Sequence, residues 1–451
     1  MNRGSLIQRH LLPSLTVAIL LAVSPDASHA GLTDTSTPES MLTAAIESSQ
    51  DAISLFSIAS NLLAKGNEAS KLAEGISLLE RSAAQNYSPA LFELANFYEN
   101  GLHVKRDLDK AINLYEQAAK QGHVDSQYNL GVLYLRLSPD TDKATYWFKQ
   151  AASQQDVDAE YNLALLYDSR DPKTADQAKA AHWYALAAQH GHKDAQFDLG
   201  VRYLKGVGQK LDQTQAAHWF MKAAEQHDPA AAFNLGLMYE DGQGVEQSID
   251  KAVYWYREAA RQGEPGAQYN LGVKYLLGEG VAQDQKKGME WILKAADGNN
   301  PAAQHTVGFM YDQGIDLPKD DAMALYWYRQ AAEQGYTDAQ LSLASMFAQG
   351  QGVEIDLEEA ISWFRKAAES NDPIAQFNLG TYMAHGVGTA RDLPAAAYWL
   401  SLSAQQGYEH AVANRDYVLQ LLTDSERDEV DRRLQNAALN TQHQDNQASI
   451  Q

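Results

Sequence analysis

All eight tryptophans of the 451-residue chain are separated by the same interval of 36 residues; they are Trp147, Trp183, Trp219, Trp255, Trp291, Trp327, Trp363 and Trp399. A fixed period of about 20 to 50 residues is the signature of a stacked repeat array. One unit reads AQYNLGVKYLLGEGVAQDQKKGMEWILKAADGNNPA from Ala267, and eight further units begin at Ala90, Ser126, Ala159, Ala195, Ala231, Ala303, Ala339 and Ala375. The nine units run from Ala90 to His410 and predict one stacked body rather than several unrelated domains.

Each unit is predicted to contain two helices. In the first, Ala267, Leu271 and Tyr275 lie four residues apart and share one face, while Gly272 leaves room for a neighbouring backbone. Gly278 and Gly280 then allow a turn with positive φ. The second helix is predicted to start after a residue that caps its free N–H groups. The nine capping positions hold Asp107, Asp140, Asp176, Asp212, Ser248, Asp284, Asp320, Asp356 and Asp392.

The second helix has a buried stripe that contains the tryptophan. In the unit from Ala267, this stripe is Trp291 with Ala295 and Ala296, where small residues beside a large one let successive helices interlock. One helix pair cannot bury such a face alone, so stacking of neighbours is required. The predicted fold is all-α, an α/α solenoid of about nine to ten helix-pair repeats with terminal caps.

The chain is predicted to divide into six parts. These are a signal peptide (1–30), a polar linker with the start of an N-terminal cap helix (31–52), a degenerate N-terminal repeat (53–89), nine repeats (90–410), C-terminal capping helices (411–439) and a disordered tail (440–451). The degenerate repeat is inferred because Leu78 to Ala84 imitates a second helix. The tail is inferred from its polar composition.

The motifs L-G-x-x-Y, G-x-G-V, D-x-x-K-A and W-Y-x-x-A-A recur in register across these units. Their order and spacing resemble the Sel-1-like repeat family, which is related to the tetratricopeptide repeat. The resemblance covers Ala90 to His410, and more weakly the chain from Ile53. It implies a right-handed superhelix of antiparallel helix pairs that acts as an adaptor. The resemblance to exported bacterial members of the family also implies a role in cell-envelope signalling, assembly or host interaction.

The first 30 residues have the pattern of a secretory signal. Arg3 and Arg9 precede the apolar run from Leu11 to Val23, and Ser28-His29-Ala30 places small residues at a cleavage site. We expect cleavage after Ala30 and a periplasmic or secreted mature protein that does not insert into the membrane.

Charge and cysteine content exclude several classes of site. A formal net charge of −22 argues against a nucleic-acid partner. With no cysteine, the chain has no disulfide, thiolate metal site or cysteine nucleophile.

A row of polar residues predicts a partner-binding surface on the first helices, which line the concave face in related helical repeats. Amides recur three residues into these helices and can pair with a partner's backbone; four residues later comes a set rich in methionine, an adaptable apolar residue. The two sets nominate Asn129, Asn162, Asn234, Asn270, Asn378, Arg202, Met238, Lys274, Met310 and Met346. The alternative is that the amides satisfy a neighbouring turn and the methionines fill the core.

Three patterns that can carry chemistry have simpler interpretations. The G-x-G turns recur in register with no strand before them, unlike dinucleotide loops. Ser248-Ile249-Asp250-Lys251 matches S-x-x-K, but Ser248 stands at a capping position. His182, His190 and His192 form the densest histidine group, without a third fixed ligand. We therefore nominate no catalytic, metal or cofactor residue and expect no cofactor.

The sequence predicts an exported, non-catalytic scaffold that binds a protein or an extended peptide through contacts added repeat by repeat. The alternative class is an envelope hydrolase or a glycan- or peptidoglycan-binding factor. An off-register Ser, His or Glu cluster that interrupts the repeat would favour this alternative, and we find none in the sequence.

Overall fold

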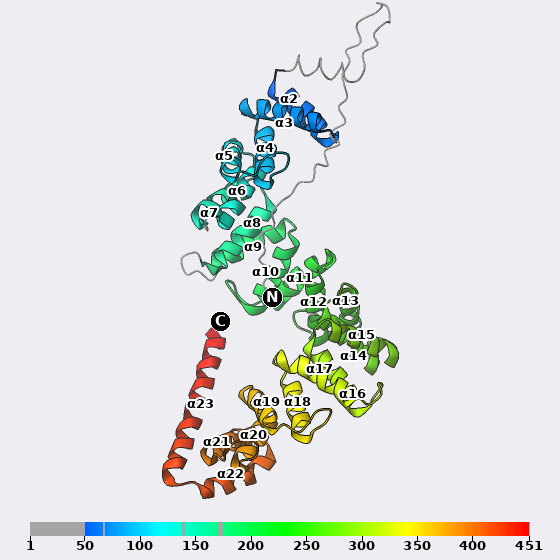
Figure 1. Ribbon diagram of the computed structural model, residues 1–451, viewed down its shortest axis with the longest axis vertical. Coiled ribbons are helices and arrows are strands. Elements are labelled where there is room, and N and C mark those ends of the chain that lie inside the picture. The colour runs from blue at the N-terminus through cyan, green and yellow to red at the C-terminus, as the bar shows by residue number, and fades with distance from the viewer. Residues whose placement is uncertain (1–49, 66–67, 138–139, 170–174, 451) are drawn as a thin grey trace, which may run out of the picture. The chain divides into compact units, whose positions relative to one another are not determined.

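The computed structural model describes residues 50–65, 68–137, 140–169 and 175–450, and every regular element in these ranges is an α-helix (Figure 1). The chain divides into two compact units, with the boundary between Leu199 and Gly200 inside α10 (Lys193–Lys205). Consecutive helices pack against each other from α2 to α9 in the first unit and from α11 to α22 in the second. The all-α solenoid architecture expected from the sequence is confirmed.

The first unit contains the helices that precede α10. They are α2 (Ala52–Lys65), α3 (Ala69–Ala84), α4 (Ser88–Asn100), α5 (Leu108–Lys120), α6 (Val124–Leu137), α7 (Thr141–Ala152), α8 (Val157–Tyr167) and α9 (Gln177–Gln189).

The second unit contains the helices that follow α10. They are α11 (Gln213–Glu225), α12 (Pro229–Asp241), α13 (Ile249–Arg261), α14 (Pro265–Leu277), α15 (Gln285–Asp297), α16 (Pro301–Gln313), α17 (Asp321–Glu333), α18 (Thr337–Gln349), α19 (Leu357–Glu369), α20 (Pro373–His385), α21 (Leu393–Gln405), α22 (Glu409–Leu421) and α23 (Asp424–Ile450).

The start of each second helix follows the predicted capping chemistry. At all nine predicted positions the side chain accepts a hydrogen bond from a backbone N–H in the first turn of the helix. At Asp284 this bond comes from the N–H of Lys287 at 3.0 Å, and the Lys287 Nζ also lies 2.8 Å from the carboxylate. The same ammonium lies 5.8 Å from the centre of the Tyr275 ring. The recurring Lys and Tyr of the motifs thus contact each other across the turn.

The glycine of L-G-x-x-Y lets the two helices of a repeat approach closely. A Cβ on Gly236 would lie 2.6 Å from the ring of Tyr256 on the second helix. In the turn, glycine is needed for its backbone freedom rather than its small size. Gly278 ends α14 with a φ of 74°, in the left-handed region that residues with a Cβ rarely adopt. Substitution at either site would therefore be strained for a different reason.

The residue after each tryptophan, rather than the tryptophan itself, fills the centre of the repeat; in the first repeat, which has no tryptophan, this residue follows Leu114. This core position is at most 3% exposed in all nine repeats; it holds Tyr115, Phe148, Tyr184, Phe220, Tyr256, Ile292, Tyr328, Phe364 and Leu400. Trp147 and Trp363 are buried, but Trp255 and the other five tryptophans are only half-buried. Trp327 packs at the junction with the preceding repeat, against a cluster that includes Ile292 and Val307. The expectation of a fully buried tryptophan row is corrected accordingly.

Helix pairs also occupy both ends of the described chain. In the first unit, α2 and α3 pack together in the segment predicted to be a degenerate repeat. In the second unit, α23 packs against α21 and buries Val430. This helix continues to Ile450, through the segment from Asn440 that was expected to be a disordered tail. The segment contains neither proline nor glycine, so nothing in it stops a helix.

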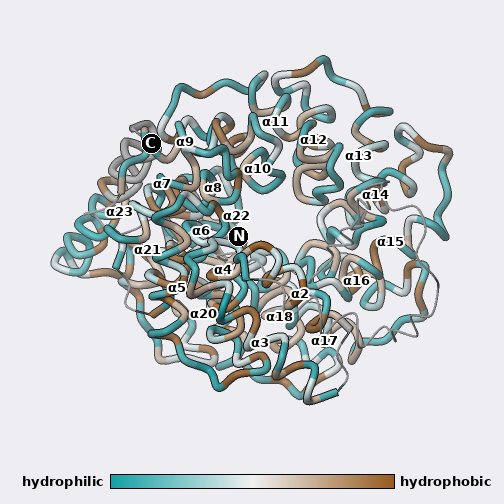
Figure 2. Tube along the Cα trace, turned by 90° about the horizontal axis from the view of Figure 1, so that it is seen from above, coloured by the Kyte–Doolittle hydropathy of each residue, from teal (hydrophilic) through white to brown (hydrophobic). Residues whose placement is uncertain are grey.

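Hydrophobic and hydrophilic residues are interspersed along the helices, without long apolar runs (Figure 2). None of the helices in the described part of the chain is long and apolar enough to cross a membrane. The predicted signal peptide, residues 1–30, lies outside the described residues.

Candidate functional site

The ten residues nominated as a partner-binding surface lie in two different environments. Asn234, Asn270 and Asn378 are half-buried. The other seven are at most 7% exposed; they are Asn129, Asn162, Arg202, Met238, Lys274, Met310 and Met346. These seven side chains therefore expose little surface, in contrast to the expectation of an open row, and their binding role stays a prediction.

The helical periodicity explains why the methionine positions are buried. Met310 follows Ala303 and Val307 along one stripe of α16, and all three residues are at most 6% exposed. One residue earlier, Phe309 is 45% exposed. The accessible face of the first helix therefore contains the third, sixth and tenth residues after the unit start, which are Thr306, Phe309 and Gln313 in α16. The seventh residue, Met310 in α16, belongs to the buried stripe.

The two nominated cations bind groups of their own turn and of the neighbouring repeat. The Lys274 Nζ lies 2.6 Å from carboxylate oxygens of both Glu240 and Glu279. Burial lowers the pKa of Lys274, but the bonds to the two carboxylates outweigh burial, and the net shift is upward. Arg202 donates to the backbone carbonyl of Val207 at 3.2 Å. Both residues stabilise the fold rather than offering a charge to a partner.

The nominated asparagines bond to their own helix and to buried tyrosines. The Asn162 Nδ2 donates to the carbonyl of Asp158 at 2.8 Å and to the hydroxyl of Tyr128 at 3.2 Å. The Asn234 Nδ2 donates to the carbonyl of Ala230 at 2.7 Å. These bonds agree with the structural alternative for the amides, although the half-buried members still reach the surface.

A groove of about 510 Å³ opens on the first helices of the second unit. We call it the first-helix groove. The residues that line it are Phe309, Asp312 and Gln313 of α16, Tyr328 of α17, Leu341, Ser342, Ser345, Met346 and Gln349 of α18, Ile374 and Asn378 of α20, and Lys319 and Gln351 of the turns. Of the nominated residues, only Asn378 and Met346 line it.

The sequence contains a signal for this groove that the motif analysis missed. At the sixth position after the unit start, successive repeats of the second unit have Leu237, Val273, Phe309, Ser345 and Thr381, while the core positions beside them recur. Residues that hold neighbouring repeats together recur at the same position in each repeat. A position whose residue changes from repeat to repeat is therefore expected on the accessible surface.

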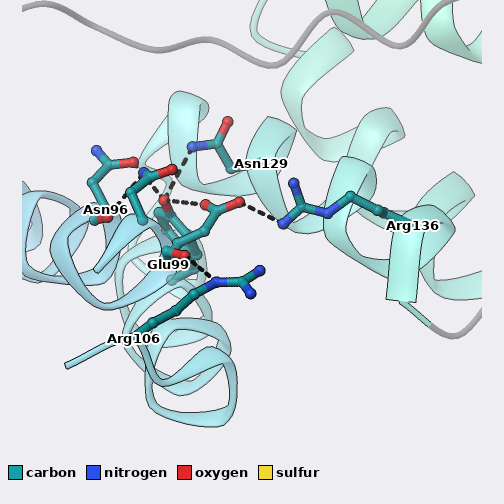
Figure 3. A network of polar contacts seen from close by, with 7 residues as sticks. Asn96, Glu99, Arg106, Asn129 and Arg136 are labelled. Carbon is teal, nitrogen blue, oxygen red and sulfur yellow. Dashed lines mark hydrogen bonds and ion pairs between the residues drawn. The ribbon is translucent and has the colours of Figure 1, made fainter. Parts of the chain in front are cut away.

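A second polar feature joins the repeats within the first unit (Figure 3). The Tyr115 hydroxyl donates to the Glu99 carboxylate at 2.9 Å, and the Asn129 Nδ2 donates to the same hydroxyl at 3.3 Å. Arg136 lies 2.8 Å from the other Glu99 oxygen. Burial, followed by the charge of Glu99, raises the pKa of Tyr115, so the hydroxyl stays protonated. The network pairs a buried carboxylate and leaves only the Asn129 Oδ1 without a partner.

This network follows a rule that links two positions of the repeat. Where the core position is tyrosine, the ninth residue after the unit start is acidic; the four pairs are Tyr115 with Glu99, Tyr184 with Asp168, Tyr256 with Glu240, and Tyr328 with Asp312. Where the core position is Phe, Ile or Leu, the ninth residue is Leu or Ala. A buried hydroxyl needs a partner, and in the first three pairs the acidic residue accepts the hydrogen bond of the tyrosine hydroxyl. The carboxylates therefore have a structural role.

The S-x-x-K motif and the histidine group make local structural contacts. The Ser248 Oγ accepts the N–H of Lys251 at 3.4 Å as a helix cap. His182 packs edge-on against Trp183, while His190 contacts the Glu160 carboxylate at 2.9 Å. Within the residues that the structure describes, no group of three His, Asp or Glu side chains is arranged to hold a metal ion.

The repeat register agrees with a family model described as the Sel1 repeat. The model matches nine consecutive segments, at 88–123, 124–156, 157–192, 193–228, 229–264, 265–300, 301–336, 337–372 and 373–408. The chain belongs to the Sel1 repeat family. It is a Sel1-type helical scaffold, a class that generally mediates protein interactions without catalysis.

Two solved structures of Sel1 proteins show what the chain is similar to. One is a protective antigen of uropathogenic Escherichia coli with the SLR fold; it is 27% identical, with a TM-score of 0.59, and the match covers 88% of this chain and 93% of that chain. The other is a Sel1 repeat protein from Oxalobacter formigenes; it is 31% identical, with a TM-score of 0.42, and the match covers 77% of this chain and 90% of that chain. No curated protein matches the sequence significantly.

Proposed function

We propose that this protein is an exported scaffold that binds an extended segment of another protein in the first-helix groove. The observation that carries the proposal is the lining of the groove, in which amides and hydroxyls surround two exposed apolar side chains.

The polar lining suits a peptide backbone. Gln313, Ser345 and Gln349 occupy the accessible face of α16 and α18, and Asn378 continues it on α20. Amides and hydroxyls both donate and accept hydrogen bonds. An extended segment presents alternating N–H and C=O groups, each of which must be satisfied when it leaves water. The groove offers partners of both kinds without requiring a charged ligand.

The apolar part of the groove provides an anchor. Phe309 on α16 is 45% exposed, and Ile374 on α20 is 44% exposed. Leu341 on α18, the first helix of the intervening repeat, also lines the groove. An apolar side chain of the partner that contacts these residues would remove apolar surface on both sides from water, which stabilises a complex. A preformed groove also lowers the entropic cost of binding.

The cellular setting is part of the proposal and depends on the N-terminal sequence. Residues 1–30 have the charged start, short apolar run and small-residue site of a signal peptide. The partner would accordingly be a protein of the cell envelope or of the exterior.

The test uses the full mature chain and a displayed library of peptides. The tightest selected peptide is measured by calorimetry against wild type, Phe309→Ala and Asn378→Ala. We expect Phe309→Ala to weaken binding about tenfold or more, as for a central apolar contact. Asn378→Ala should weaken it less, because it removes one amide at the edge of the groove.

Two matched variants control for general effects. Tyr254→Ala removes an aromatic ring that is 51% exposed on α13, and Asn234→Ala removes the equivalent amide on α12; neither residue lines the groove. Both should bind like wild type, and all four proteins should melt at similar temperatures. Unchanged binding by the two groove variants, or equal loss in the controls, would place the partner on another surface.

A further inference from the structure

A neutral glutamine contact recurs at the junctions between repeats. One residue after the unit start, a glutamine Nε2 donates to the backbone carbonyl eight residues earlier, at the end of the preceding second helix. The distance is 3.0 to 3.3 Å in six repeats, at Gln127, Gln196, Gln268, Gln304, Gln340 and Gln376.

In three of these repeats the same glutamine also receives a bond from the far end of its own repeat. The donors are Gln154 to Gln127, Gln334 to Gln304, and Gln406 to Gln376, at 2.7 to 2.9 Å. We call each of these pairs a glutamine clasp. It joins the first turn of the first helix to the end of the second helix, and its strength does not depend on pH because neither amide titrates.

The repeat at 157–192 has titratable residues at both positions of the clasp. Glu160 stands where the other repeats have the first glutamine, and His190 stands where they have the second. The His190 Nδ1 lies 3.0 and 2.9 Å from the two Glu160 oxygens. Glu160 is 0% exposed, so its carboxylate has lost the solvation that an ion needs.

Charged groups of the same helix and its N-cap surround the pair. Asp156 caps α8 and is itself 6% exposed, and its charge opposes ionisation of Glu160. Asp158 lies 3.5 Å from the His192 Nε2, which precedes α10. The ring of His192 stacks on Tyr161, with 4.2 Å between the ring centres.

The basic residues of the neighbouring helices have other partners. On α7, Lys149 lies over the ring of Tyr167 at 5.9 Å, and Lys143 pairs with Asp140. On α9, Lys179 pairs with Asp176. At the start of α10, Lys193 and Asp194 act on His192 with opposite signs. His190 is thus the basic side chain that contacts Glu160 directly.

We propose that Glu160 and His190 form a proton-dependent clasp. One proton shared by the pair holds the two helices of repeat 157–192 together, and its loss as the pH rises loosens this repeat but not the glutamine-clasped repeats. Without that proton, a buried carboxylate faces a neutral imidazole.

The direction of the pH dependence follows from the shift at Glu160. Burial raises the pKa of Glu160, and the hydrogen bond and charge of His190 offset only part of this effect. A carboxyl whose pKa is raised in the folded state contributes stability that is fully present below its unfolded pKa, about 4.3, and is lost as the pH rises through the folded value. The loss of stability therefore begins above a pH of about 4.3 and continues as the pH rises through the folded pKa of Glu160.

His192 changes the stability of this region with pH in the opposite direction, so it must be present in every protein that is compared. Its Nδ1 accepts the N–H of Ala195 at 3.2 Å, so the cap needs this nitrogen unprotonated. Burial lowers the pKa of His192, which means that acid weakens the cap. The contribution of His192 cancels when wild type is compared with a variant that differs only at Glu160 and His190.

The experiment measures amide hydrogen exchange of α8 and α9 in the full chain from about pH 5 to 8, corrected for intrinsic rates. In wild type, we expect protection of these helices to fall about tenfold or more with rising pH, since one pKa unit corresponds to a tenfold change. Glu160→Gln/His190→Gln recreates the glutamine clasp and should reduce the change to about twofold or less. Equal pH profiles in wild type and this variant would overturn the proposal.

The reverse substitution tests whether the pair is sufficient. Gln127→Glu/Gln154→His should transfer the pH dependence to α6 and α7, and Gln127→Ala/Gln154→Ala should loosen these helices equally at every pH. This second experiment tests the proton-dependent clasp even if Glu160→Gln/His190→Gln fails to fold. Exchange of α6 and α7 that stays independent of pH in the transplanted protein would contradict the mechanism.

Discussion

Tyr256 and Trp255 are neighbours on α13 but have different surroundings. The Tyr256 ring is fully buried, lies against Gly236, and bonds through its hydroxyl to Glu240. Trp255 is half-buried and packs edge-on against the exposed Tyr254. At the scale of single residues, the most conspicuous side chain of the repeat is therefore not the one that carries most of the packing energy.

Substitutions at these two positions should separate their contributions. We expect Tyr256→Ala to lower the free energy of unfolding by about 3–5 kcal/mol, because it leaves a cavity and removes the hydrogen bond between the Tyr256 hydroxyl and Glu240. Trp255→Ala should cost about 1–2 kcal/mol, since only part of its ring leaves water. Urea denaturation followed by circular dichroism measures both. Equal costs would mean that the tryptophan row carries as much packing energy as the core position.

Helix caps are the element-scale feature that the sequence predicted best. A cap depends on a side chain and the three residues after it, so the local sequence contains all of the information. Ser248 is the one position of nine without an aspartate. Its Oγ accepts the Lys251 N–H at 3.4 Å, longer than the 3.0 Å of the equivalent bond at Asp284.

Exchange of this cap should change stability without affecting binding. Ser248→Ala should destabilise the protein by about 1 kcal/mol. Ser248→Asp should be at least as stable as wild type, because a carboxylate at a helix N-terminus also interacts favourably with the helix dipole. Thermal melts of the three proteins provide the comparison. Loss of peptide binding in either variant would link this helix end to the site.

The accessible face of the first helix was harder to predict than the caps. Sequence spacing correctly placed Ala267 and Leu271 on one buried stripe, but it could not decide whether Lys274 continues that stripe. Lysine and arginine are rarely buried unless paired, and the partners Glu240 and Glu279 come from another helix and a turn. The groove is lined by residues from three first helices, so no single repeat encodes it.

At the scale of the whole molecule, stability is expected to be a sum over repeats and their junctions. Each junction then has its own properties, set by residues such as Gln127, Glu160 and Gln304. A groove in one part of the array and a titratable clasp in another can thus arise by substitution at surface or junction positions, while the caps and the core position keep the fold.

Export is a property of the whole chain, and its test needs no partner. We expect the mature protein to begin at Gly31, because Ala30 and Ser28 place small residues where the cleaving enzyme requires them. Intact-mass measurement of envelope or culture material should give the mass of residues 31–451. Ala30→Gln should leave the precursor uncleaved, whereas the neighbouring change Ala27→Gln should leave processing intact. An exported wild-type protein that retains residues 1–30 would instead favour a membrane anchor, and the partner would then be sought at the membrane surface.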